Sequence, residues 1–168
     1  MARRRQAGFT LIEAVVAITV FSLGVVALIG MSTIAKSTSE QGRDSVQVSN
    51  YLQEGIEAVR LLRNNSWNNV STNGGYRLSA QAGQNPPWQL VSGGSETIGK
   101  YSRSVAIATV RREDMDGSGT LTAGDRIVAT GGAFDDPDTK KVTVTITWQQ
   151  GTRTITRQLY AYVTKWQS

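Results

Sequence analysis

The N-terminal part of the chain is a long apolar run from Phe9 to Ala35, and its one charged residue is Glu13. An apolar run of about 18 residues or more predicts a membrane span. Three arginines, Arg3 to Arg5, stand before the run. Basic residues beside one end of a span favour a cytoplasmic location for that end. A carboxylate inside a bilayer costs about 2.5–3.5 kcal/mol or more, so the position of Glu13 predicts a functional role.

The helical pattern continues beyond the apolar run, from Ser37 to Asn65. Apolar residues recur there at spacings of three or four, which indicates one face of a helix: Val48, Leu52, Ile56, Val59 and Leu62. Gly42 and Gly55 each weaken a helix interior by about 1 kcal/mol relative to Ala. The apolar stripe predicts the face on which a globular domain packs.

The rest of the chain has a β pattern. Residues 66–100 are rich in Gly, Asn and Ser, with short strands expected around Tyr76–Ser79 and Trp88–Val91. Two later stretches alternate, with Val105, Ile107 and Thr109 on one face of the first and Val142, Val144, Ile146 and Trp148 on one face of the second. A tight turn at 149–152 leads to a returning strand whose inward face is Ile155, Leu159, Ala161 and Val163, interrupted by Arg157. A long helix followed by an antiparallel meander predicts an α+β fold.

The start of the apolar run resembles a processing signal. Arg3 to Arg5, Gly8 and Phe9-Thr10-Leu11-Ile12-Glu13 are similar to the cleavage and methylation signal of type IV pilins and type II secretion pseudopilins. The resemblance implies that a prepilin peptidase cuts between Gly8 and Phe9 and N-methylates Phe9. It implies that Glu13 neutralises the N-terminal amine of a neighbouring subunit during assembly. It also implies one helix whose apolar first half is followed by a second half lying against a sheet.

This resemblance sets the expected organisation. We expect a basic leader at 1–8, a transmembrane and assembly helix at 9–35, an amphipathic continuation at 36–65 and a globular β-rich domain at 66–168. The protein would cross the cell membrane once, with its N-terminus cytoplasmic and its domain outside, and then enter an extracellular or periplasmic fibre. Its expected partners are the membrane, prepilin peptidase and other pilin subunits.

Two simpler interpretations of the apolar run compete with this one. An ordinary signal peptide has an apolar region of about 7–15 residues and an exit of small residues, and Thr33-Ile34-Ala35 matches that exit poorly. A plain single-pass anchor accounts for the length of the run but leaves Glu13 unexplained.

The amino-acid composition limits the kinds of reaction and binding site that the chain can provide. The 168 residues carry a formal charge of +5. Removal of the three leader arginines leaves 15 basic and 13 acidic side chains, a net charge of +2, so charge says little about partners. The chain contains no Cys and no His, which excludes disulfides and the usual catalytic triads and zinc sites. We therefore expect a protein that is not an enzyme.

One motif predicts a metal site. Residues 114–125 match the twelve-residue calcium loop, in which oxygen donors at positions 1, 3, 5, 9 and 12 and a backbone carbonyl at 7 surround a hard cation. The corresponding residues are Asp114, Asp116, Ser118, Thr122 and Asp125, with Thr120 supplying the carbonyl. Gly119 occupies the sharp turn at position 6. We expect structural Ca²⁺ at this loop, since an ion bound only by the folded state stabilises it.

The loop departs from the template in ways that predict weak binding. Ser118 replaces the usual Asp or Asn, and Asp125 replaces the longer bidentate Glu. Strands rather than helices flank the loop, which makes it similar to the isolated calcium loops of extracellular modules. The alternative is a solvated acidic turn. Asp135, Asp136 and Asp138 either complete the site or form a second polar turn, and we expect the turn.

Three classes of function remain. The first is a structural subunit of a type IV pilus or pseudopilus, and the run from Gly24 to Gly30 and the missing disulfide loop resemble minor pilins. The second is a minor pilin whose domain binds DNA or a surface through scattered basic residues: Arg103, Arg111, Arg112, Arg126, Arg153, Arg157 and Lys165. The third is a membrane-tethered calcium-binding module that never polymerises. Replacement of Glu13 distinguishes the first class from the third.

Overall fold

The computed structural model describes residues 10–128 and 131–165. The chain divides into two compact units, one ending at Val46 and one beginning at Gln47. The elements in chain order are α1 (Leu11–Asn65), the 3-10 turn η1 (Trp67–Asn69), β1 (Gly74–Ala80), β2 (Trp88–Ser92), β3 (Glu96–Ile98), β4 (Tyr101–Glu113), β5 (Arg126–Val128), β6 (Phe134–Gln150) and β7 (Arg153–Thr164). Helix α1 begins in the first unit and ends in the second.

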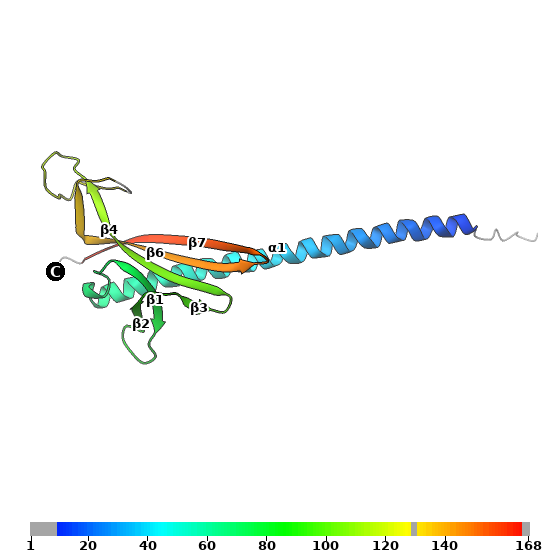
Figure 1. The fold of residues 1–168 in the computed structure, drawn as a ribbon, viewed down its shortest axis with the longest axis horizontal. Helices are drawn as coiled ribbons and strands as arrows, with labels where there is room; N and C mark the ends of the chain where they lie inside the picture. Colours follow the sequence, from blue (N-terminus) through cyan, green and yellow to red (C-terminus); the bar gives the residue numbers. More distant parts are fainter. Residues whose placement is uncertain (1–9, 129–130, 166–168) are drawn as a thin grey trace, which may run out of the picture. The chain divides into compact units, whose positions relative to one another are not determined.

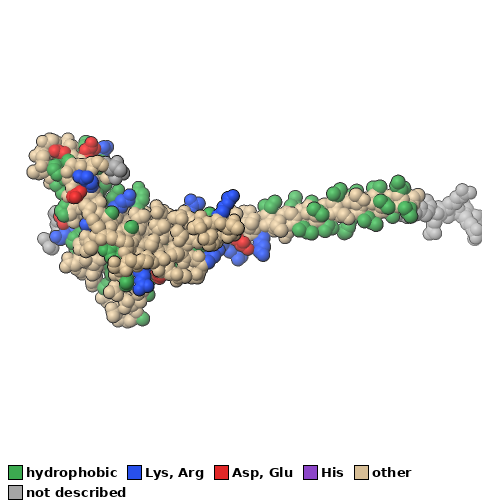
Figure 2. Space-filling view, in the orientation of Figure 1, with side chains coloured by type: hydrophobic (Ala, Val, Ile, Leu, Met, Phe, Trp, Pro, Cys, Tyr) green, Lys and Arg blue, Asp and Glu red, His purple; other side chains and the backbone are tan. Residues whose placement is uncertain are grey.

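In the first unit, α1 exposes its apolar side chains. Leu11, Ile12 and Phe21 are 85%, 73% and 73% exposed, and similar residues follow as far as Ile34. Figure 2 shows hydrophobic side chains along this part of the helix. Among the described residues α1 is the one helix long and apolar enough to cross a membrane.

The hydroxyl groups of this apolar segment bond to the helix itself. Thr19 and Ser22 donate at 2.8 Å to the carbonyls of Val15 and Ile18, one turn earlier. Thr33 donates to the carbonyl of Gly30 at 2.8 Å. A polar group without a partner is costly in hydrocarbon, and these bonds satisfy the hydroxyl donors inside the helix.

The second unit is an antiparallel sheet with the C-terminal part of α1 packed on one face. The sheet has seven strands in the order β2-β1-β4-β6-β7, and β3 and β5 also pair with β4. Figure 1 shows the long strands β4, β6 and β7 side by side. This is the α+β fold that the sequence predicts.

The core lies between α1 and the sheet, where the predicted apolar stripe is buried. The buried hydrophobic cluster consists of Val48, Leu52, Ile56, Ala58, Val59, Leu62, Val70, Leu78, Tyr101, Val105, Ile107, Val142, Val144, Ile146, Trp148 and Val163. Val59 on α1 and Val142, Val144 and Ile146 on β6 are 0% exposed. Close packing of such side chains is the main source of stability for this unit.

Gly55 sets how closely the helix approaches the sheet. A Cβ atom added at Gly55 would lie 2.8 Å from Cγ1 and 3.1 Å from Cγ2 of Val144. The same addition at Gly42 would meet nothing within 4 Å. Gly55 therefore costs helix propensity but permits the contact between α1 and β6.

Strand β4 departs from the predicted alternation at a β-bulge. Val105 and Ile107 face the core as expected, but the register shifts between Thr109 and Val110. Val110 is 3% exposed and takes the inward place predicted for Thr109. Thr109 pairs with Lys140 but Val110 pairs with Asp136, so the additional residues of this irregularity lie on β6, and β4 resumes pairing with Val110 on the core side.

Arg103 is a second departure from the pattern on β4. We expected it among exposed basic residues, but it is 1% exposed and points inward. Its guanidinium donates to Glu96 at 2.6 Å, to Glu54 at 3.0 Å and to the carbonyl of Tyr51 at 3.1 Å, and it lies over the ring of Trp88. Three acceptors and an aromatic face compensate the burial of this charge.

The last two strands form a hairpin with the predicted tight turn. Gln150 on β6 pairs with Arg153 on β7, and Gly151 and Thr152 connect them. Gly151 has a φ angle of +61°, in the left-handed region that such turns require and glycine favours.

Candidate functional site

The first candidate site is the start of the apolar helix. Gly8 and Phe9 lie outside the described residues. Glu13 is exposed in the first turn of α1, where its backbone N–H donates to the carbonyl of Thr10 at 3.1 Å. The positive end of the helix dipole stabilises a carboxylate in this turn. One acidic group thus stands at the beginning of a helix surface that is otherwise uncharged as far as Ala35.

The second candidate site is the loop between β4 and β5. Asp114, Asp116 and Asp125 each offer a carboxylate oxygen, and these oxygens all lie within 4.8 Å of one another. Asp125 is buried, with 3% of its surface exposed, whereas Asp116 is exposed. Like charges at this separation repel by about 1 kcal/mol per pair even in water. A set of oxygen donors fits a hard divalent cation, which would remove that repulsion.

Backbone and side-chain donors hold two of these carboxylates in place. Asp114 accepts from the N–H groups of Ser118 at 3.1 Å and Gly119 at 3.0 Å. Asp116 accepts from the N–H of Ser118 at 3.0 Å and from the hydroxyl of Thr122 at 3.1 Å. Hydrogen bonds from the side chain and then the backbone of Ser118 hold the pKa of Asp116 below its ordinary value. These hydrogen bonds therefore favour the ionised form of Asp116.

The other predicted ligands belong to the same hydrogen-bonded loop. The buried carboxylate of Asp125 accepts from the N–H groups of Thr122 at 2.8 Å and Met115 at 3.1 Å, which ties the end of the loop to its beginning. The hydroxyl of Ser118 donates to the carbonyl of Thr120 at 3.0 Å. The structure therefore brings three of the predicted ligands together directly and connects the other three to them.

The second acidic segment is not the polar turn that we expected. Asp135, Asp136 and Asp138 belong to strand β6. Asp136 is buried and accepts from Nε of Arg112 at 2.7 Å, while Asp135 pairs with Arg111 at 3.2 Å and Asp138 lies 3.9 Å from Lys165. Strand pairing explains the difference. Pairing with β4 places Asp135 and Asp136 near Arg111 and Arg112, and the pairing of Thr139 with Thr164 on β7 places Asp138 near Lys165. These carboxylates do not belong to the group of Asp114, Asp116 and Asp125.

Arg112 connects the loop to the sheet, a role that sequence reasoning missed. Its Nη1 donates to the backbone carbonyl of Asp125 at 2.8 Å, while its Nε donates to Asp136. No local pattern identifies this residue, since Asp125 becomes its neighbour only when β5 pairs with β4, and Asp136 only when β6 pairs with β4. Arg112 therefore fixes the end of the candidate metal loop against β6.

Most of the basic residues considered for DNA binding lie in ion pairs in the described part of the chain. Arg111, Arg112 and Lys165 pair with the aspartates of β6, and Arg103 with two glutamates. Arg126 pairs with Glu113 at 2.8 Å. Arg153 and Arg157, both on β7, are exposed. Paired charges contribute little to binding a phosphate backbone.

Comparison with known proteins identifies the N-terminal segment. A family model described as the prokaryotic N-terminal methylation motif matches residues 3–29. The chain carries the signature of type IV pilins and pseudopilins. Neither a search of curated proteins nor one of solved structures finds a significant match. The pilin motif is that of a structural family rather than a catalytic one.

Proposed function

We propose that this chain is a prepilin that becomes a structural subunit of a type IV pilus or pseudopilus. Prepilin peptidase would cut it after Gly8 and N-methylate Phe9. The match of the methylation motif to residues 3–29 carries the proposal, and the exposed apolar surface of α1 supports it. The same helix would anchor the subunit in the membrane before assembly, with the arginines on the cytoplasmic side and the β-domain outside.

Glu13 would determine the register of assembly. Leu11, Ile12 and Val15 are exposed here, and in a fibre they would pack against neighbouring helices, as would Val16, Ile18 and Val20. Lipid is as apolar as these side chains, so their packing gives little preference for one register over another. A carboxylate in hydrocarbon strongly favours a cationic partner, and the N-terminal amine of a neighbouring subunit would supply it.

The first test is the N-terminal residue and mass of the protein recovered from its own membranes. We expect a chain that starts at N-methylated Phe9. A chain that keeps its leader would contradict prepilin processing and support a plain anchor. A start at Lys36 would show that the apolar run is an export signal.

The second test replaces Glu13 by alanine and compares fibres with membrane-bound protein. We expect the variant to reach the membrane in normal amounts but to be lost from sheared fibres. Glu40→Ala is the control, because Glu40 lies on the same helix outside the apolar segment. Normal fibre incorporation of Glu13→Ala would contradict the assembly role and favour a subunit that never polymerises.

We further propose that the loop 114–125 binds Ca²⁺ as a structural ion. The convergence of the Asp114, Asp116 and Asp125 oxygens supports this, and Ser118, Thr120 and Thr122 would complete the donor set. With Ser and Asp in place of stronger ligands, we expect a Kd of about 10⁻⁴–10⁻³ M, the range of extracellular modules.

Thermal unfolding tests the metal. We expect Ca²⁺ at about ten times its Kd to stabilise the wild type by about 1.4 kcal/mol and so raise its Tm. Asp116→Ala should abolish this shift, since alanine offers no oxygen to a cation and Asp116 is exposed. Asp138→Asn, an acidic residue outside the loop, should keep it. A Tm that does not respond to Ca²⁺ in the wild type would contradict the proposal.

A further inference from the structure

Strand β7 is a long sheet edge. It is the last strand in the sheet order, so one side pairs with β6 and the other pairs with no strand among the described residues. Its 12 residues include neither proline nor an acidic residue. A regular edge of this kind presents a row of backbone N–H and C=O groups that can pair with another extended chain.

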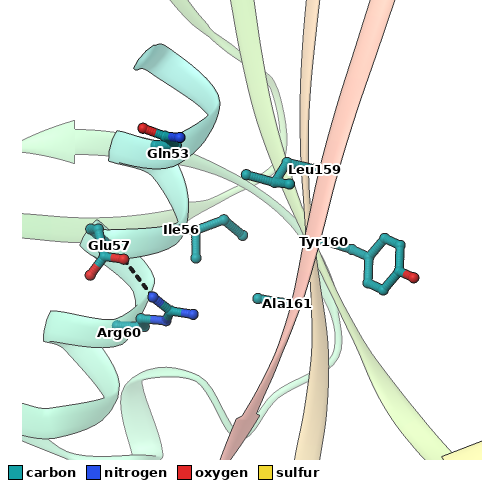
Figure 3. A pocket seen from close by; sticks show the side chains of 7 residues that line it. All are labelled: Gln53, Ile56, Glu57, Arg60, Leu159, Tyr160 and Ala161. Carbon is teal, nitrogen blue, oxygen red and sulfur yellow. Dashed lines mark hydrogen bonds and ion pairs between the residues drawn. The ribbon is translucent and has the colours of Figure 1, made fainter. Parts of the chain in front are cut away.

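A groove runs beside this edge, between β7 and α1. Its volume is about 370 Å³, and its apolar lining is Ile56 from α1 with Leu159 and Ala161 from β7. In Figure 3, Leu159 and Ala161 point toward the helix and Tyr160 points away from it. Leu159 is 37% exposed, although Val144, its partner on β6, is 0% exposed. The helix therefore covers the inner face of β6 and leaves the inner face of β7 partly open at Leu159.

The charges around the groove are mainly positive. Arg157 shares the groove face of β7 with Leu159, because side chains alternate along a strand, and it is exposed. On the helix side Arg60 pairs with Glu57, so these two charges compensate each other. Arg153 adds a second positive charge to the beginning of the strand. An acidic ligand complements this edge.

We propose that the β7 edge and its groove bind an extended acidic peptide segment by strand addition. The segment's backbone pairs with the free edge of β7, one of its apolar side chains enters the groove against Leu159 and Ala161, and a carboxylate pairs with Arg157. Strand addition beside a helix-lined groove gives affinity through the backbone and specificity through alternate side chains. This site requires only the fold of residues 47–165 and not the processing or assembly of the N-terminus.

The same arginines exclude other occupants. A charged side chain on the inner face of an edge strand discourages pairing with apolar strands. Two copies of β7 would bring Arg153 and Arg157 of both chains together, and like charges across a strand pair are unfavourable. The carboxylates of an acidic segment instead attract these arginines, so β7 favours an acidic segment over the β7 strand of a second copy.

The test measures binding of a fluorescent synthetic peptide to the full chain in detergent micelles. The peptide carries glutamate and valine two positions apart, with threonine between them, so that both side chains lie on the groove side of β7, and a second peptide carries lysine in place of glutamate. We expect the acidic peptide to bind and the lysine peptide not to bind. N-methylation of the backbone amides on one set of alternate residues should abolish binding, while methylation of the other set should leave it intact, because only one edge of the peptide pairs with β7.

Variants locate the site. Arg157→Glu should lower the affinity for the acidic peptide by at least about tenfold and should create affinity for the lysine peptide. Gln158→Glu, the matched control, places the same charge on the opposite face of β7 and should change affinity much less. Ala161→Trp should also abolish binding, because the indole fills the groove. If Ala161→Trp fails to fold, the effect of Arg157→Glu on peptide affinity still tests the site.

Three results would overturn the proposal. One is no binding of the acidic peptide at about 1 mM, a concentration that corresponds to only −4.1 kcal/mol of affinity. Another is binding that survives methylation of either amide set, which indicates a nonspecific electrostatic contact. The third is an equal effect of Arg157→Glu and Gln158→Glu.

Discussion

Gly55 shows how one residue can oppose its element and still stabilise the fold. In sequence it is a weak point of a helix, but a Cβ added there would approach Val144 to 2.8 Å, so any larger residue disturbs the core. The pattern of apolar residues identifies the buried face and cannot identify this distance, because the helix-to-sheet spacing depends on side chains of a strand that is distant in sequence.

We expect Gly55→Ala to destabilise the second unit by about 1–3 kcal/mol, because overpacking outweighs the helix propensity gained. Thermal unfolding followed by tryptophan fluorescence would measure this as a lower Tm. Gly42→Ala is the control, since a Cβ there meets nothing within 4 Å, and it should leave the Tm unchanged or slightly raised. A Gly55→Ala variant as stable as the control would show that Val144 and strand β6 can shift to accommodate the added methyl group.

Asp136 makes a contribution to stability that depends on pH. Burial raises the pKa of its carboxyl, but hydrogen bonds from Thr139, Arg112 and the backbone of Asp138 outweigh burial and bring the pKa below its ordinary value of 3.8. The unfolded chain therefore binds a proton more readily than the folded one. The stabilisation is complete above the ordinary value and is lost as pH falls from there through the lower folded-state pKa.

We expect Asp136→Asn to lower the Tm at pH 7 and to reduce the loss of stability on acidification. Unfolding curves at pH 7 and near pH 3 for both proteins would measure this. Asp135→Asn serves as the control, because its pair with Arg111 is exposed. An equal difference between wild type and Asp136→Asn at both pH values would contradict the assignment.

The sequence predicts well those elements in which hydrophobic residues recur at a regular helical or strand spacing. The stripe from Val48 to Leu62 and the alternation from Val142 to Trp148 are buried as expected, since a single face of each element meets the core. Strand β4 was predicted less well. The irregular pairing at Thr109 and Val110 breaks the alternation, and Arg103 places a charge on the inward face that otherwise carries apolar residues. Both features depend on partners distant in sequence.

The candidate metal loop likewise has a local pattern that sequence reveals and distant contacts that it does not. Its template names a ligand set from a local pattern, and the structure brings the three aspartates of that set together, while metal binding itself stays a prediction. The roles of Arg112 and Asp136 could not be predicted, because they arise from the pairing of β4 with β5 and β6. The N-terminal signature needs no tertiary structure, and the family match to residues 3–29 bears it out.

The Arg103 cluster joins α1, β3 and β4, and its removal should be costly. We expect Arg103→Ala to destabilise the second unit at the lower end of about 3–5 kcal/mol, since Glu54 and Glu96 remain partly exposed and can be hydrated. Arg126→Ala, which breaks an exposed pair with Glu113, should cost about 0–1 kcal/mol. Chemical denaturation of both variants would compare them, and equal losses would contradict a special role for Arg103.

At the scale of the whole molecule, the second unit contains its own core. The buried hydrophobic cluster begins at Val48, and no member lies in the described part of the apolar segment, residues 10–35. We expect a chain without residues 1–36 to be soluble without detergent and to unfold cooperatively, with a Tm within a few degrees of the full chain. Circular dichroism and thermal unfolding would test this, and aggregation or loss of the transition would show that the apolar segment supports the β-domain.

The hydrogen bond from Arg63 to the carbonyl of Thr164 at 2.9 Å joins the end of α1 to the end of β7. Val48 and Val163 likewise share one core although they are the first and last residues of that cluster along the chain. During synthesis the helix therefore emerges long before Val163 and the rest of β7. Until that strand is available, the core lacks Val163 and the edge of β6 that pairs with β7 stays open to aggregation, so completion of the fold waits for β7.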